Sequence, residues 1–244
     1  MLGRFAVISI AAVVAIAPVA AAGIPNWDAA SGFKPDQLSP AWTFGGAQNA
    51  VLAGGALRIT GRTYYGLGPE TIPAFDAADG LDIEARVRYV SGTTQLDSRD
   101  AVDLVFTQGA GYGVGFFIGD DRIFLNSGNV QRGATAYVDT HGFHTYRFAL
   151  SATDAQTHLA SIDVFRDGIL TLSGSTYYSL PANGTDQSMS FGGGSIYASG
   201  VSDWLFVRNT PMVPEPASWA LMLAGFGMVG AGIRRQRTEV ARAG

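Results

Sequence analysis

A strict alternation of apolar and polar residues in the segment LDIEARVRYV, residues 81–90, constrains the fold more than any other feature of the chain. Apolar residues occupy the odd positions and charged residues the even positions up to 88: Leu81, Ile83, Ala85, Val87 and Tyr89 against Asp82, Glu84, Arg86 and Arg88. Successive side chains of a β-strand point to opposite faces, so this pattern predicts a strand with one buried and one wet face. Between Trp42 and Arg208 we find no comparable helical stripe.

Short apolar runs separated by turn residues fill the rest of the segment from 40 to 210. Such runs occupy residues 101–106, 112–126, 143–151, 159–173 and 189–209, and residues 49–65 supply the first strands. We predict turns at Gly54-Gly55, Gly119–Asp121 and Asp167-Gly168, because glycine and aspartate tolerate the positive φ of tight hairpins. The sequence therefore predicts an all-β antiparallel sandwich over residues 40–210, after a lead-in at 23–39.

The first 22 residues have the organisation of a secretory signal peptide. One cation, Arg4, precedes a mostly apolar run over residues 5–17, and small residues follow a proline. We predict cleavage after Ala22, with Ala20 and Ala22 before the cut and Gly23 after it. A membrane anchor is the alternative, but the apolar run is short for one. The pattern implies a helical leader outside the fold, export by the Sec machinery and processing by signal peptidase.

Charge and cysteine content narrow the classes of function. The segment 23–213 holds 18 acidic and 11 basic residues, a net charge of −7, with Lys34 as its one lysine. An acidic body of this kind does not suit a phosphate-binding surface, so we expect no nucleic-acid partner. The chain has no cysteine, which excludes disulfides, thiol nucleophiles and cysteine-ligated zinc. An exported protein without disulfides fits a bacterial envelope.

The C-terminal segment predicts a single transmembrane helix. Residues 217–233 form 17 uncharged positions, about 25 Å of helix, the low end of what spans a bilayer. A buried core helix is the alternative, but the run follows the completed sandwich and ends at the basic residues Arg234, Arg235 and Arg237. Because positive residues stay on the cytoplasmic side, the sandwich is expected outside and the tail 238–244 inside.

The segment 211–237 resembles the PEP-CTERM sorting signal of Gram-negative bacteria that make exopolysaccharide. The resemblance rests on Val213, Pro214, Glu215 and Pro216, on the apolar helix after them, and on the basic stop Arg234, Arg235 and Arg237. It implies recognition by an exosortase and processing near the motif. The chain would be held in the inner membrane as an intermediate and would then reach the cell surface or the extracellular matrix of a biofilm.

The sandwich itself resembles the concanavalin A-like lectin and glucanase jelly roll, in its laminin-G-like form. Residues 80–89, 139–150, 162–168 and 202–209 carry this resemblance. It implies glycan binding, or glycan cleavage by strand-borne carboxylates. Asp82 and Glu84 are the nearest match to such a carboxylate set, but no third carboxylate follows on their face. The alternating acids and bases there favour an ordinary solvated face, and we expect no catalytic residue.

Aromatic and acidic residues supply the remaining site candidates. Tyr64, Tyr65 and Tyr112 are candidates for stacking on a sugar, because glycines beside a strand can admit a ligand. The resemblance also implies calcium at loop tips, with Asp120-Asp121 or the aspartates of segment 97–100 as ligands. Aspartate stabilises turns without a metal, and we favour ordinary turns here, so no cofactor is the main expectation. No two of the three histidines, at 141, 144 and 158, are expected to share a metal with a carboxylate.

These observations lead to one main hypothesis and two alternatives. The main hypothesis is an exported, exosortase-sorted protein with a non-catalytic, lectin-like sandwich that binds exopolysaccharide. The first alternative is a glycoside hydrolase or lyase on the same fold. The second is an adhesin with a protein partner.

Overall fold

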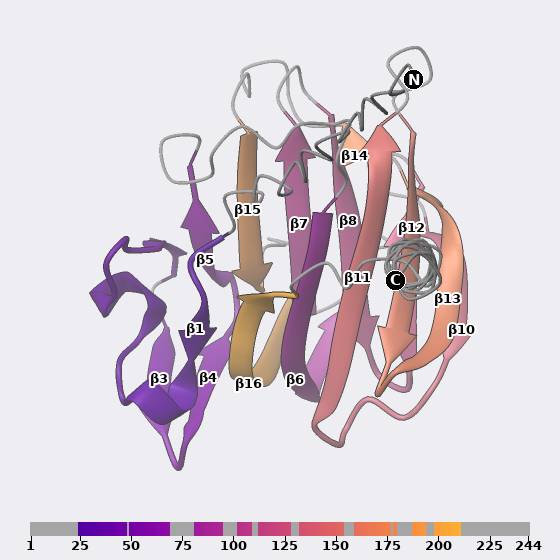
Figure 1. Cartoon of the computed structure of the whole chain (residues 1–244). Helices are drawn as coiled ribbons and strands as arrows, with labels where there is room; N and C mark the ends of the chain where they lie inside the picture. The colour runs from indigo at the N-terminus through magenta and orange to yellow at the C-terminus, as the bar shows by residue number, and fades with distance from the viewer. Residues whose placement is uncertain are drawn as a thin grey trace, which may run out of the picture.

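The computed structural model is a sandwich of two antiparallel β-sheets, which confirms the predicted all-β jelly-roll class. It describes residues 24–47, 49–68, 81–94, 102–108, 112–127, 132–153, 159–176, 178–179, 187–193 and 198–210. In Figure 1 one sheet faces the viewer and the other lies behind it. We name them sheet A and sheet B. The predicted signal and transmembrane helices lie outside the described residues.

Sheet A contains the first and the last strands of the sandwich. Its strands follow the order β13-β12-β11-β6-β16-β4-β3, with β1 added beside β16. Their bounds are β1 Trp27–Asp28, β3 Ala50–Ala53, β4 Ala56–Thr60, β6 Leu81–Thr94, β11 His144–Thr153, β12 Ala160–Arg166, β13 Ile169–Thr176 and β16 Ala198–Asn209. Two 3-10 helices, η1 Ala29–Ser31 and η2 Pro35–Gln37, follow β1.

Sheet B contains the other strands of the sandwich. Its order is β10-β9-β8-β7-β15-β5-β2, and β14 pairs with β8. Their bounds are β2 Thr43–Gly46, β5 Thr63–Leu67, β7 Val102–Gln108, β8 Tyr112–Gly119, β9 Arg122–Asn126, β10 Arg132–Tyr137, β14 Tyr178–Ser179 and β15 Gln187–Gly192. Because β8, β9 and β10 are neighbours both in sequence and in the sheet, the β8–β9 turn lies near one edge of sheet B.

The alternation of apolar and polar residues over 81–90 is realised in β6. Ile83, Ala85, Val87 and Tyr89 are all at most 5% exposed, whereas the charged residues between them lie on the outer face. β6 pairs with both β11 and β16 and is therefore central in sheet A. The hairpin predicted at Asp167-Gly168 is also confirmed, with φ of 51° and 81° at its two central residues.

Aromatic rings dominate the core between the sheets. Phe191 of sheet B lies at the centre of the largest group, with its ring centroid 4.8 Å from that of Trp204 and 5.0 Å from that of Trp42. Tyr65 stacks beside it at 5.7 Å. These four side chains are at most 1% exposed. Burial of large rings supplies much of the stability of a domain without disulfides.

A second layer of rings lies on the outer face of sheet B. Phe117 and Phe124 are cross-strand partners, fully buried, and stack at 5.2 Å. Neighbouring Gly115 leaves room for them, because a Cβ atom there would lie 2.8 Å from the Phe117 ring. β8 therefore buries side chains on both of its faces, which the sequence pattern did not predict.

Four strands lie outside the predicted runs, namely β1, β2, β10 and β14, and β10 closes one edge of sheet B. Among the described residues, no helix has the length and apolar character needed to cross a bilayer. The segment 217–233 is not part of that search.

Candidate functional site

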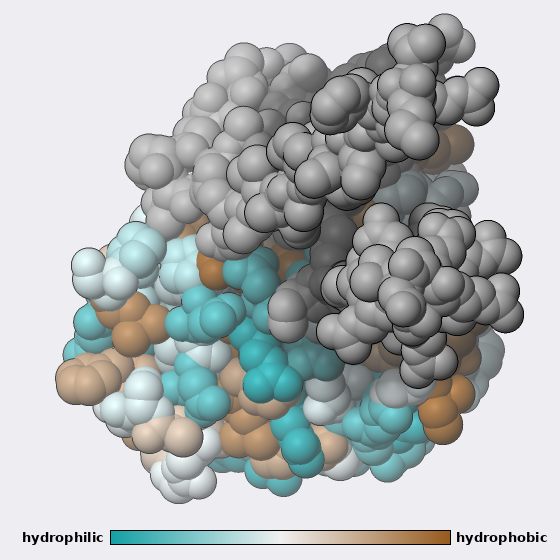
Figure 2. Space-filling model, in the orientation of Figure 1, coloured by the Kyte–Doolittle hydropathy of each residue, from teal (hydrophilic) through white to brown (hydrophobic). Residues whose placement is uncertain are grey.

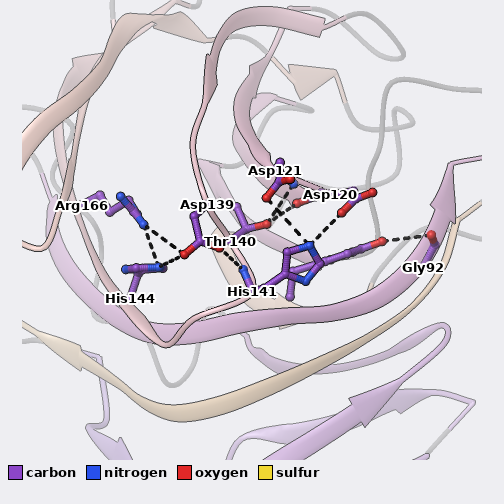
Figure 3. Close-up of polar contacts among 10 residues, drawn as sticks. Gly92, Asp120, Asp121, Asp139, Thr140, His141, His144 and Arg166 are labelled. Carbon is purple, nitrogen blue, oxygen red and sulfur yellow. Dashed lines mark hydrogen bonds and ion pairs between the residues drawn. The ribbon is translucent and has the colours of Figure 1, made fainter.

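Two turns meet at one end of the sandwich and form a cluster of polar side chains. The β8–β9 turn contributes Asp120 and Asp121, and the segment after β10 contributes Asp139, Thr140 and His141 (Figure 3). Antiparallel pairing of β9 with β10 explains the meeting, because the residues before β9 then lie opposite those after β10. We call Asp120, Asp121 and His141 the turn cluster.

Buried Thr140 fixes the two turns to each other. Its hydroxyl donates to the carbonyl of Gly119 at 2.7 Å and accepts from the Asp121 N–H at 3.2 Å. The Thr140 carbonyl accepts from the backbone N–H of Tyr89 at 2.9 Å, which ties the segment to β6. Thr140 is fully buried, so these bonds are shielded from water.

The imidazole of His141 faces both aspartates of the turn. Its Nε2 lies 2.9 Å from Oδ1 of Asp120 and 3.8 Å from Oδ1 of Asp121. Tyr89 packs edge-on against the His141 ring, with centroids 5.5 Å apart. One ligand atom from each member of the turn cluster lies within 4.8 Å of the others, and all three residues are exposed.

The donor set of the turn cluster fits a divalent cation. Two carboxylates alone are typical ligands of calcium, which prefers oxygen. An imidazole added to them is typical of zinc and other first-row transition metals. The sequence analysis named Asp120 and Asp121 but did not connect His141 with them. The aspartates of segment 97–100 and His158 lie outside the described residues.

A second polar group adjoins the turn cluster through Asp139. Oδ1 of Asp139 accepts the backbone N–H of His141 at 3.0 Å, and its Oδ2 lies 3.5 Å from Nε2 of His144. The His141 N–H, together with the weaker influence of His144 and Arg166, holds the pKa of Asp139 below its ordinary value. Figure 3 shows Asp139 between the two groups.

His144 contacts the last residue of β12 and the turn that follows it. Its Nδ1 lies 2.7 Å from Oδ2 of Asp167, and its Nε2 lies 2.7 Å from Nη2 of Arg166. Because the guanidinium can only donate, Nε2 accepts and Nδ1 carries the proton that bonds Asp167. Burial raises the pKa of Asp167, but the Thr145 N–H, His144 and Arg166 outweigh burial and the net pKa is lowered. The β12–β13 turn is thereby fastened to β11.

The three tyrosines proposed as sugar-stacking residues have different places. Tyr64 lies partly exposed on the outer face of sheet B, with its ring over Gly45, where a Cβ atom would lie 2.5 Å away. Tyr65 is fully buried between Phe44 and Phe191, so it is withdrawn as a ligand candidate. Tyr112 belongs to β8, but its side chain is outside the described part of the structure.

Asp82 and Glu84 each bind an arginine on the outer face of sheet A. The Arg147 guanidinium donates to Asp82 from Nε at 2.9 Å and also from Nη2. The Arg208 guanidinium donates to Glu84 at 2.7 Å and 3.0 Å. The geometry supports the interpretation of a solvated, ion-paired face at these two residues rather than a catalytic pair.

Comparison with known families adds one assignment. Residues 213–236 match the family described as the PEP-CTERM protein-sorting motif, so the chain carries this sorting motif at its C-terminal end. The match includes the predicted motif Val213, Pro214, Glu215 and Pro216 and the basic residues Arg234 and Arg235. All of these residues lie outside the described part of the structure. No curated protein matches the sequence of the chain.

Solved lectin-like domains and a glucanase are similar to the sandwich. The carbohydrate recognition domain of Emp46p, in its metal-free form, has 14% identity and a TM-score of 0.42, over 78% of this chain and 96% of that one. The exoplasmic/lumenal domain of VIP36 bound to Ca²⁺ and Man3GlcNAc has 13% identity and a TM-score of 0.43, over 76% and 90%. A prokaryotic β-1,3-1,4-glucanase from a mouse hindgut metagenome has 13% identity and a TM-score of 0.41, over 77% of this chain and 98% of that one. These likenesses concern the fold alone.

Proposed function

We propose that the chain is an exported protein, sorted by an exosortase to the cell surface or matrix, whose non-catalytic sandwich binds polysaccharide. The observation that carries the proposal is the sorting motif at 213–236, which follows a β-sandwich complete at Asn209. A lectin-like fold is what supports the binding part. The inner membrane then holds the protein only as an intermediate.

Sorting is tested by the acidic residue of the motif. We expect Glu215→Ala to leave the unprocessed chain in the membrane fraction while the sandwich stays folded, as judged by protease resistance. Glu239→Ala is the matched control, because Glu239 is also C-terminal but lies after the matched residues. Identical processing of both variants and wild type would remove exosortase from the proposal. Immunoblots of cell fractions measure the outcome.

Glycan binding is placed on the outer face of sheet B, at Tyr64. A partly exposed ring held flat above a glycine offers the apolar face on which a sugar ring can stack. We expect Tyr64→Ala to abolish the signals that wild type gives on a glycan array of neutral sugars. Tyr137→Ala is the control, since Tyr137 is 83% exposed and lies on β10 at the other edge of the sheet. A blank wild-type array would contradict the binding proposal.

The proposal that the sandwich is non-catalytic has its own test. We expect no release of reducing sugar from β-glucans or matrix polymers incubated with the protein. Release that disappears in Asp82→Ala or Glu84→Ala would replace this proposal with the glycan-cleaving alternative. The ion pairs of both residues with arginine are the observation against that alternative.

A divalent cation at the turn cluster is a second proposal, supported by the 4.8 Å grouping of its three ligand atoms. Calorimetric titrations with Ca²⁺ and with Zn²⁺ separate the two ligand chemistries. We expect Zn²⁺ binding to be lost in both Asp121→Asn and His141→Ala, whereas Ca²⁺ binding would depend on the aspartate alone. Asp163→Asn on β12 is the control. Absence of heat with both ions would end this proposal.

A further inference from the structure

The outer face of sheet A concentrates the basic residues of an acidic protein. Five arginines from four adjacent strands lie on it: Arg58, Arg86, Arg88, Arg147 and Arg208. We call them the arginine face. Their acidic partners on the same face are Asp82, Glu84 and Asp203. On these four strands five cations lie among three anions, a local excess of +2 in a segment, 23–213, that carries −7 as a whole. Asp28 of β1 and Asp163 of β12 also lie on the outer face of sheet A, outside these four strands.

The ion pairs are layered: the carboxylates lie nearer the sheet, and the guanidinium groups lie nearer the solvent. The three carboxylate side chains are 4% to 20% exposed, whereas their four arginine partners are 37% to 52% exposed. Solvent therefore meets the positive partner of each pair. Figure 2 shows hydrophilic residues gathered over β6 and β16, in the middle of this face.

Each of the paired arginines keeps donors available for another molecule. Arg58, Arg88, Arg147 and Arg208 all bind their carboxylate through Nε and Nη2, and Nη1 bonds no described residue. Since a guanidinium has five N–H donors, more than half of them remain. Arg86 is exposed and forms no ion pair with any residue in the described part of the chain.

Aromatic rings hold three of these guanidinium groups in place. Arg88 lies over Phe143 at 4.6 Å, Arg147 over Phe165 at 5.2 Å and Arg208 over Phe206 at 4.2 Å. A cation stacked on a ring and bonded to a carboxylate has little freedom left to lose when a ligand binds. The face is therefore preorganised for anions.

The spacing of the cations indicates the kind of anion. Registered cross-strand neighbours form two rows, Arg147–Glu84–Arg208 and Arg88–Asp203–Arg58. The two arginines of a row lie two strands apart, about 9–10 Å at the usual strand spacing. A nucleic acid is more densely charged, with one phosphate per about 3.4 Å of rise along each strand. The rows therefore match a polymer whose charges are sparser, and a carboxylate on such a polymer can accept paired bonds from a guanidinium.

We infer that the arginine face binds an acidic polysaccharide that carries carboxylates at intervals along its chain. This surface is separate from the Tyr64 face, because the two lie on the outer sides of different sheets. The inference goes beyond the proposed function, since it assigns a second binding surface and the charge of its ligand. Two such surfaces on opposite sides of one sandwich would let a single molecule join two polymers.

Hyaluronate, in which acidic and neutral sugars alternate, is the probe, and carboxyl-reduced hyaluronate is its uncharged counterpart. The full chain, purified in a non-ionic detergent, is titrated with both by biolayer interferometry. We expect binding to hyaluronate alone, weakening strongly between about 0.05 and about 0.3 M salt as screening increases. Equal binding of the carboxyl-reduced polymer, or no binding of hyaluronate at low salt, would overturn the inference.

Arg86→Glu is the informative variant, because Arg86 supports no ion pair within the described structure and its loss should not unfold the sheet. We expect the affinity for hyaluronate to fall about tenfold, from one lost attraction and one new repulsion. Arg62→Glu, an exposed arginine in the β4–β5 turn, is the matched control and should change it less than about twofold. Equal losses in both variants would show net charge, not the face, to be responsible.

Two further measurements distinguish this inference from nucleic-acid binding and from the Tyr64 proposal. Duplex DNA binding as tightly as hyaluronate would overturn the assignment of a sparsely charged polysaccharide. Tyr64→Ala should leave hyaluronate binding unchanged, and Arg86→Glu should leave the neutral-glycan signals unchanged. The two proposals are therefore tested independently: either the Tyr64 proposal or the arginine-face inference can fail while the other stands.

Discussion

The outer faces of the two sheets differ in chemistry: that of sheet A carries ion pairs, and that of sheet B carries buried aromatic rings. On sheet A, carboxylates such as Asp203 lie beneath arginines, and water meets guanidinium groups. On sheet B, Phe117 and Phe124 are fully buried, with Gly115 making room beside them. A face of ion pairs keeps its alternating pattern because each charge must reach water or a partner. A face covered by rings loses that pattern, since both sides of the strand become apolar.

Removal of a ring from the outer face of sheet B should have the largest effect on stability. We expect Phe117→Ala to lower the free energy of unfolding by about 3–4 kcal/mol, because it empties a fully buried site. Phe165→Ala, on the outer face of sheet A, should cost about 1 kcal/mol, since that ring is only partly buried beneath Arg147. Urea unfolding of both variants measures the difference. Equal losses of unfolding free energy in the two variants would mean that rings on the two outer faces contribute equally to stability.

Added volume beside that ring should be the next most damaging change. Gly115→Val places a Cβ atom 2.8 Å from the Phe117 ring and 3.3 Å from Cβ of Asn126. We expect a loss of about 2 kcal/mol from overpacking. Ser161→Val, at an exposed position of β12 in sheet A, is the control and should change stability by less than about 0.5 kcal/mol. Thermal unfolding monitored by circular dichroism compares them, and a neutral Gly115→Val would contradict the close packing.

The ion pairs of sheet A should contribute less, and in a pH-dependent way. Burial raises the pKa of Asp203, but hydrogen bonds from Arg58 and Arg88 outweigh it, so the net pKa is lowered. A lowered folded-state pKa stabilises the protein above the ordinary value of about 3.9, and this contribution is lost as the pH falls through the folded-state value. We expect Asp203→Asn to cost about 1 kcal/mol at pH 7.

The pH at which that cost disappears is the diagnostic measurement. Urea unfolding of wild type and Asp203→Asn should converge as the pH drops below about 4, where the wild-type carboxylate takes up a proton. A cost that stays constant from neutral to acidic pH would show that the side chain acts through packing rather than charge.

The smallest effect is expected at Arg86. Because this side chain is exposed and has no ion pair among the described residues, Arg86→Ala should change the unfolding free energy by less than about 0.5 kcal/mol. The same urea titrations detect it. A larger loss would indicate that Arg86 supports the sheet and is not free to meet a ligand.

Local patterns were enough to predict most of the strands and the main hairpins. Alternation placed the two faces of β6, and Asp167-Gly168 marked the β12–β13 turn because both residues take positive φ. β8 was misjudged because GVGFFIG is apolar on both faces, so periodicity does not say which side meets the core. Tyr65 was separable from Tyr64 in principle, since buried Thr63 and Leu67 share its parity on β5.

The turn cluster was only half predictable. Asp120 and Asp121 are recognisable as a hairpin turn, but His141 reaches them only because β10 pairs with β9. That strand, RGATAY, has few β-branched or large apolar residues and was not predicted. Had it been, the antiparallel pairing alone would have placed residue 141 opposite the turn. Contacts between turns follow from topology and not from local sequence.

The way the chain ends of the sandwich are fastened bears on how a tethered molecule carries load. β1 pairs with β16, and the Asn209 side chain donates to the Ile24 carbonyl at 2.7 Å, so the two ends of the described sandwich are joined at one corner. Traction on a membrane tether after residue 213 would enter through β16, which lies between β6 and β4. The force would act along a central strand. It would have to break the hydrogen bonds on both sides of that strand at once, whereas force on an edge strand would break them one after another. The sorting motif thus follows a strand whose backbone is paired on both of its sides.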